Sequence, residues 1–145
     1  MSEDVIGGPP RSFYVISGLA LVWNLIGVMQ YVMRVTMTDA AIAVLPANQQ
    51  ALINATPSWA LAAFAIATNA AALACLLMLL KKAWAYPLFI VALVAVLVQD
   101  FHGFAMADGM AAYGVAGVVL TALVLVISAY LVWYSKGARD KGWIS

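Results

Sequence analysis

Five polar residues at the ends of two long apolar runs are the first candidates for chemistry. Gln30 and Arg34 are one helical turn apart at the end of the first run, whereas Gln99, Asp100 and His102 lie close to the end of the third. A carboxylate inside an apolar segment is costly unless it faces water or a partner, and such residues often mark binding sites or ion paths. We therefore expect these side chains to form a polar pocket that opens to one side of a membrane.

The charges in this cluster predict one specific contact. Arg34 is the only basic residue at its end of the apolar runs, so we expect it to form an ion pair with Asp100. The pair has two interpretations, since it could belong to a binding site or could only hold the first and third runs together. His102 follows Asp100 by two residues, so the two do not share a helix face, and a metal site from these two alone is not expected.

Two asparagines lie deeper in the apolar runs than this cluster. Asn24 and Asn69 are each about ten residues, or about 15 Å along a helix, from the same end of the first and second runs. They could hydrogen-bond to each other, a contact between membrane helices that stabilises by about 0.6–2 kcal/mol. They could also line a polar path for a substrate, and the sequence leaves both interpretations open.

The sequence disfavours several chemistries. Cys75 lies near one end of the second run and His102 near the opposite end of the third, so they do not form a nucleophile–base pair. The runs contain no lysine for a Schiff base and no glutamate for a di-iron site, and one histidine cannot supply both axial ligands of a haem. A dimeric haem site, or a pair of His102 with Met29 or Met106, is the remaining alternative. We expect no catalytic residue, no metal and no cofactor.

The composition indicates which elements position these residues. Of the 145 residues, 66% are hydrophobic and 9% are charged, whereas soluble domains are about half apolar and a quarter charged. Four apolar runs of about 20 residues each have the length at which a helix crosses a hydrocarbon core of about 30 Å. The expected spans are 13–33, 59–80, 84–104 and 113–134. We predict a single all-α domain over residues 1–145, a polytopic membrane protein folded as an antiparallel four-helix bundle.

The basic residues predict the orientation of this bundle. Six of the seven lysines and arginines lie at one end of the spans, and Arg34 lies at the other. The six are Arg11, Lys81, Lys82, Lys136, Arg139 and Lys141. Because basic loops stay in the cytoplasm, we expect both termini there and the protein in the bacterial inner membrane. The first run is too long, and its leader with Glu3 and Asp4 is not basic, so it is not expected to be a cleaved signal peptide.

The longest connection, residues 34–58, lies outside in this orientation and is predicted to hold two short helices. The first runs through Ala40 to Leu45, where Thr38 or Asp39 can cap it, and Pro46 ends it. The second follows Pro46 and ends before Pro57. Their apolar residues favour a segment on the membrane surface or over the bundle, which could be an ordered cap or a functional lid.

Two spans differ in their polar and small residues. Alanines recur every four residues in the second span, as at Ala63, Ala67 and Ala71, which lets helices approach closely and predicts a central position or a subunit interface. The fourth span has only Thr121 and Ser128 as polar residues, and we interpret it as an ordinary wall of the bundle.

Several motifs resemble a group of small bacterial four-helix membrane proteins. The chain has RSFYVISGLA at 11–20 and WNLIGVM at 23–29, then WAYPLF at 84–89, VQDFH at 98–102 and VWYS at 132–135. These motifs cover nearly the whole chain. Proteins of this group often carry the automatic label "sugar transporter", and the resemblance therefore implies transport, without assigning binding residues.

Three functions remain open from the sequence. The first is a transporter or channel component that acts as a homo-oligomer, because four short helices enclose little space. The second is a non-catalytic accessory subunit of a larger membrane complex, which the absence of any cofactor motif favours. The third is an enzyme, or a lipid- or quinone-binding protein, that uses Asp100 and His102. The expected partners are the lipid bilayer and other copies or other membrane subunits, and a net charge of +1 predicts no nucleic acid.

Overall fold

The computed structural model describes residues 8–106 and 109–145, and these residues form helices and connecting turns without a strand. The elements are α2 (Arg11–Val35), α3 (Asp39–Ala43), α4 (Ala47–Ala55), α5 (Ser58–Leu79), α6 (Ala85–Phe101), the π-helix η1 (His102–Met106) and α7 (Gly109–Asp140). Four stretches are long and apolar enough to cross a membrane: Arg11–Val35, Ser58–Leu79, Ala85–Ala105 and Gly114–Asp140. The predicted class, an all-helical membrane protein with four spans, is confirmed at this level.

The third span departs from the predicted uninterrupted α-helix. The α-helical part ends at Phe101, and residues His102–Met106 continue as a π-helix, a wider turn that is rare and often found at functional sites. Asp108, where an Asp-Gly pair in the sequence predicts the turn before the fourth span, lies outside the described residues. The fourth span continues to Asp140, further than expected, and is kinked at Gly114, which has a φ of +69°.

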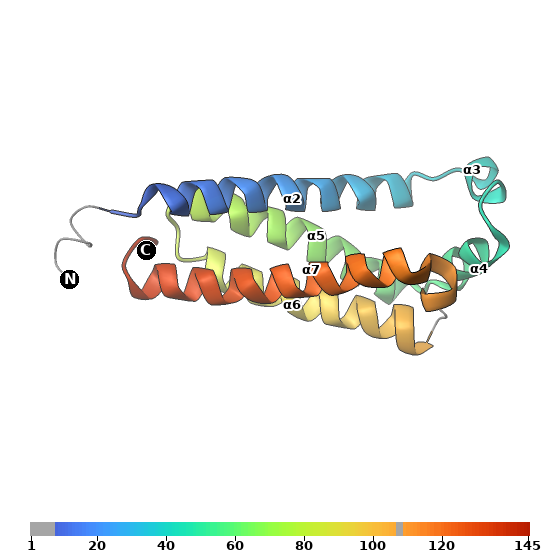
Figure 1. The fold of residues 1–145 in the computed structure, drawn as a ribbon. Helices are drawn as coiled ribbons and strands as arrows, with labels where there is room; N and C mark the ends of the chain where they lie inside the picture. The colour runs from blue at the N-terminus through green and yellow to red at the C-terminus, as the bar shows by residue number, and fades with distance from the viewer. Residues whose placement is uncertain (1–7, 107–108) are drawn as a thin grey trace.

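Helix α5 is the central element of the bundle (Figure 1). It packs along α2 on one side and along α6 on the other, while α7 packs against α6. The face that α5 buries is the predicted alanine face, including Ala63, Ala67 and Ala71. At Gly27 of α2, an added Cβ would lie 3.4 Å from the Thr68 methyl group, so small residues bring α2 and α5 close. Helices α2 and α7 make almost no close backbone contact.

Large side chains fill the bundle at the end where both described chain ends and the 80–84 turn lie, which we call the terminal end. Phe13 of α2 stacks on Tyr134 of α7 with ring centroids 6.4 Å apart. Met78, Phe89 and Leu131 pack into the same buried cluster from α5, α6 and α7. This cluster joins all four long helices at this end.

The last three residues close the terminal end from outside the helices. Gly142, with a φ of +76°, ends α7, and the Trp143 amide donates to the Ala138 carbonyl at 2.9 Å, as in a Schellman cap. The chain then turns back, and the Ser145 amide donates to the Lys81 carbonyl at 3.1 Å. Ile144 is only 2% exposed in the large-residue cluster, so the C-terminal segment contributes to the core.

The opposite end, which we call the loop end, carries α3 and α4 much as predicted (Figure 1). The Ala41 amide donates to the Thr38 hydroxyl oxygen at 3.2 Å, so of the two predicted caps Thr38 is the one that caps α3, and Asp39 is its first residue. The Gln50 side-chain amide donates to the Leu45 carbonyl at 2.7 Å and ties α4 to the turn before it. The two short helices therefore form an ordered unit.

The burial of Ile144 predicts that the C-terminal segment stabilises the fold. Ile144→Ala should reduce the free energy of unfolding by about 2–5 kcal/mol, because it removes buried apolar volume and leaves a cavity. Val44→Ala is the matched control, since Val44 is 83% exposed and its truncation should change stability by less than about 0.5 kcal/mol. Unfolding by SDS, followed by circular dichroism, measures both. Equal effects of the two substitutions would contradict the packing of the C-terminal segment.

Candidate functional site

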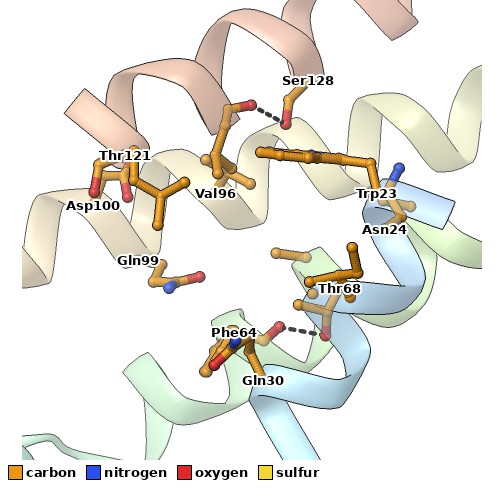
Figure 2. Close-up of a pocket in the computed structure, with 16 residues that line it drawn as sticks. Trp23, Asn24, Gln30, Phe64, Thr68, Val96, Gln99, Asp100, Thr121 and Ser128 are labelled. Carbon is orange, nitrogen blue, oxygen red and sulfur yellow. Dashed lines mark hydrogen bonds between the residues drawn. The ribbon is translucent and has the colours of Figure 1, made fainter. Parts of the chain in front are cut away.

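The four long helices enclose a cavity of about 390 Å³ in the half of the bundle towards the loop end, which we call the deep cavity (Figure 2). All four contribute polar side chains to it. These are Asn24 and Gln30 from α2, Thr68 from α5, Gln99 and Asp100 from α6, and Thr121 and Ser128 from α7. Trp23 and Phe64 add aromatic faces, and small or aliphatic residues complete the wall. Its volume is within the range of small-molecule sites, about 300–1,000 Å³.

A second cavity of about 150 Å³ adjoins the first closer to the loop end, and we call it the rim cavity. Its polar lining is Arg34, Thr56, Gln99, Asp100, His102 and Thr121. Phe64, Gln99, Asp100 and Thr121 line both cavities. These four residues mark the boundary between a space near the loop end and a space near the middle of the spans.

The predicted polar cluster is therefore divided between two adjoining spaces. Arg34 and His102 line the rim cavity, Gln30 lines the deep cavity, and Gln99 and Asp100 line both. Asp100 and His102 face the same cavity although they are two residues apart. The sequence reasoning assumed one regular α-helix, but His102 begins the π-helix, whose wider turn changes the faces that side chains present.

The expected ion pair between Arg34 and Asp100 does not form in the described part of the chain. The Arg34 guanidinium instead donates a hydrogen bond to the Ile53 carbonyl oxygen, 3.3 Å away. Ile53 lies in the last turn of α4, where carbonyl groups carry the negative end of the helix dipole. This prediction was wrong because the α4 carbonyl competes for the guanidinium.

The Asp100 carboxylate accepts no hydrogen bond from the described residues and is half-buried between the two cavities. A carboxylate withdrawn from water needs a cation, a donor or retained water to offset its desolvation. Since no described residue donates a hydrogen bond to it or pairs with its charge, Asp100 is an unpaired carboxylate at the boundary of the two cavities.

The expected hydrogen bond between Asn24 and Asn69 is also absent. The Asn24 side-chain amide donates to the Ala20 carbonyl at 2.9 Å and to the Cys75 sulfur at 3.4 Å, and so joins α2 to α5. Asn69 is exposed on the outer face of α5, where its amide donates to the Ala65 carbonyl at 2.8 Å. The two asparagines lie at equal depth but do not face each other, because Asn69 is on the exposed side of α5 and not on its buried alanine face.

His102 is buried and packs edge-on against Trp59, with ring centroids 5.4 Å apart. Trp59 lies in the first turn of α5, so this contact fixes the start of the π-helix against α5. No group of three or more histidine, cysteine or acidic side chains that could hold a metal ion occurs among the described residues.

One side of the deep cavity faces out of the bundle between α2 and α7. Ile26 of α2 and Leu120 of α7 both line the cavity, yet 47% and 55% of their surfaces are exposed. This agrees with the lack of close contact between α2 and α7. The deep cavity therefore has a lateral opening with apolar edges.

The sequence reasoning missed several residues of the site. Trp23 and Phe64 are aromatic residues within apolar runs, where they do not stand out in the sequence, and Thr121 and Ser128 were assigned to an ordinary wall. The spacing of Thr121 and Ser128, seven residues or two helical turns, places them on one face of α7 and could have indicated a polar lining.

Comparisons with known proteins do not assign the chain to a family. No protein-family model, no curated protein and no solved structure matches it. The class of protein is thus defined by its four apolar helices and the site by the two adjoining cavities.

The hydrogen bond from Arg34 predicts that α2 holds α4 in place. Arg34→Met keeps the length of the side chain but removes the donor, and should accelerate amide hydrogen exchange in α4 about five-fold, for a loss of about 1 kcal/mol. Arg34→Lys keeps the charge near the helix C-terminus and should show a smaller effect. Hydrogen exchange with mass spectrometry over residues 47–55 measures this. Unchanged exchange in Arg34→Met would contradict the role assigned to this contact.

Proposed function

We propose that the protein is a membrane transport component, a transporter or channel subunit of the bacterial inner membrane that acts as a homo-oligomer. The observation that carries this proposal is the pair of adjoining cavities that share Phe64, Gln99, Asp100 and Thr121. A carboxylate and other polar side chains that face a cavity inside a membrane bundle are costly and often mark the path of a polar solute or water.

The arrangement favours a site that is accessible from one side at a time. The cavities lie in the half of the bundle towards the loop end, whereas Phe13, Met78, Phe89, Leu131 and Ile144 pack the terminal end. A transporter that alternates its access needs a central site with one closed side. The proposal therefore favours a carrier over an open pore in a single copy.

The orientation of the proposed carrier rests on charge. Six of the seven basic residues belong to the terminal end, which the positive-inside rule assigns to the cytoplasm. Both termini then lie inside, and the cavities open towards the outside. The resemblance of the sequence motifs to small four-helix proteins that carry a transport label points in the same direction.

The homo-oligomer follows from the lateral opening between α2 and α7. Ile26 and Leu120 leave the deep cavity incomplete on that side. A second copy placed against α2 and α7 would complete its wall with apolar surface, which suits association inside a membrane through close packing.

Uptake into proteoliposomes tests the transport proposal even though the solute is not identified beforehand. The vesicles are incubated with a mixture of metabolites, and their contents are identified by mass spectrometry. We expect at least one solute to enter through the wild-type protein and to fall to the level of protein-free vesicles for Thr121→Phe. This substitution places a ring at the boundary of the two cavities.

Leu123→Phe is the matched control, because Leu123 lies on the same helix with its side chain 45% exposed and outside both cavities. It should support uptake equal to the wild type. Equal loss in both variants would indicate a general defect of α7. If no solute depends on the protein for entry, the transport proposal is wrong.

A further inference from the structure

We infer that the ligand of the deep cavity is a small amphiphilic organic ammonium ion whose charge is bound by Asp100. This inference rests on the proposed function, since it names the substrate class of the proposed carrier. Three features support it: the charge of the cavity, the free hydrogen-bonding capacity of its polar groups, and the shape of its apolar wall.

The charge of the deep cavity is negative. Among the described residues that line it, Asp100 is the only charged side chain. Arg34 and His102 line the rim cavity alone, and the Arg34 guanidinium is engaged by the Ile53 carbonyl. A cation on the deep side of Asp100 would therefore meet an uncompensated carboxylate, in a medium where electrostatic attraction is stronger than in water.

The hydroxyl groups of the deep cavity donate their hydrogens within their own helices and retain acceptor capacity. The Thr121 hydroxyl donates to the Gly117 carbonyl at 2.9 Å, and the Ser128 hydroxyl donates to the Val124 carbonyl at 2.8 Å. The Thr68 hydroxyl donates to the Phe64 carbonyl at 3.0 Å, and Figure 2 shows the Ser128 and Thr68 bonds. Each hydroxyl oxygen keeps lone pairs for a ligand.

Asn24 follows the same pattern. Its amide nitrogen donates to a carbonyl of its own helix and to the Cys75 sulfur, so its carbonyl oxygen is the group left to interact with a ligand. In the described lining, the side chains that keep free donors are Gln30, Gln99 and the indole of Trp23. A lining in which acceptors predominate, with one carboxylate, is complementary to a ligand rich in donors, and an ammonium group has donors and no acceptor.

The remaining wall selects an organic rather than a bare ion. The cavity of about 390 Å³ is far larger than a single ion, and Trp23 and Phe64 provide aromatic faces that attract cations. The lateral opening between Ile26 and Leu120 has apolar edges. An amphiphilic amine could therefore place its charged head near Asp100 and its apolar part towards this opening.

Binding of three probes of similar shape tests the charge preference. The probes are 2-phenylethylammonium, 2-phenylethanol and 3-phenylpropionate, and binding to the full-length protein in neutral detergent is measured by saturation-transfer NMR titration. At neutral pH the amine is protonated. We expect the ammonium probe to bind about ten-fold more tightly than the alcohol, because a hydrogen bond to a charged group is the stronger contact, and the carboxylate probe to bind most weakly.

Two substitutions test whether Asp100 is the source of the preference for the ammonium probe. Asp100→Asn should reduce binding of the ammonium probe to that of the alcohol and leave binding of the alcohol unchanged, which also shows that the variant is folded. Asp140→Asn is the matched control, because Asp140 is an exposed carboxylate paired with Lys136 at 3.2 Å, and it should change neither. A preference for the alcohol or the carboxylate probe, or a preference for ammonium that survives in Asp100→Asn, would overturn the inference.

Competition identifies the source of the ammonium group. Displacement of the probe by short-chain phosphatidylethanolamine, but not by short-chain phosphatidylglycerol, would assign the site to a lipid headgroup, and displacement by neither would assign it to a free amine. A protein that takes up uncharged or anionic solutes but shows no ammonium preference would retain the proposed function and lose this inference. A protein that binds the ammonium probe but takes up no solute would lose the proposed transport function and retain the assignment of the ligand.

Discussion

The structure depends on an uneven distribution of side-chain volume along four helices of similar length. At the terminal end, Phe13, Met78 and Phe89 fill the interior, and the C-terminal segment adds Ile144 to the same cluster. Towards the loop end the central helix presents alanines instead, and these draw α6 close on one side while Gly27 draws α2 close on the other. Helix α7 packs chiefly on α6 and makes almost no close backbone contact with α2, and the deep cavity lies beside this gap.

The electrostatics of the site follow from the presence of the deep cavity. In a filled bundle, Asp100 would need a protein partner, and Arg34 was the evident one. The guanidinium is instead taken by the last turn of α4, so the short helices at the loop end leave the carboxylate to the cavities. The threonine hydroxyls of α5 and α7 donate their hydrogen bonds to backbone carbonyls of their own helices, as serine and threonine commonly do within a helix. The cavity consequently has a largely apolar wall whose few polar groups are mostly hydrogen-bond acceptors.

The sequence predicted what depends on local composition and failed where the outcome depended on relative helix rotation. The four spans, the alanine face of α5 and the Thr38 cap follow from hydropathy, spacing and side-chain chemistry, all of which can be read along one chain. The contacts expected between Arg34 and Asp100, and between Asn24 and Asn69, depend on which helix faces oppose each other. Depth alone does not determine the facing sides, and the π-helix that begins at His102 changed them further.

The most direct test of a one-sided cavity is whether water reaches it from one end only. Thr121→Cys and Leu123→Cys would be exposed to a membrane-impermeant thiol reagent from each side of sealed vesicles, with buried Cys75 as the internal reference. We expect Thr121→Cys to react from the loop-end side alone, and Leu123→Cys and Cys75 to react from neither. Reaction at Thr121→Cys from the terminal-end side, or modification of Cys75, would contradict a bundle that is hollow at one end and sealed at the other.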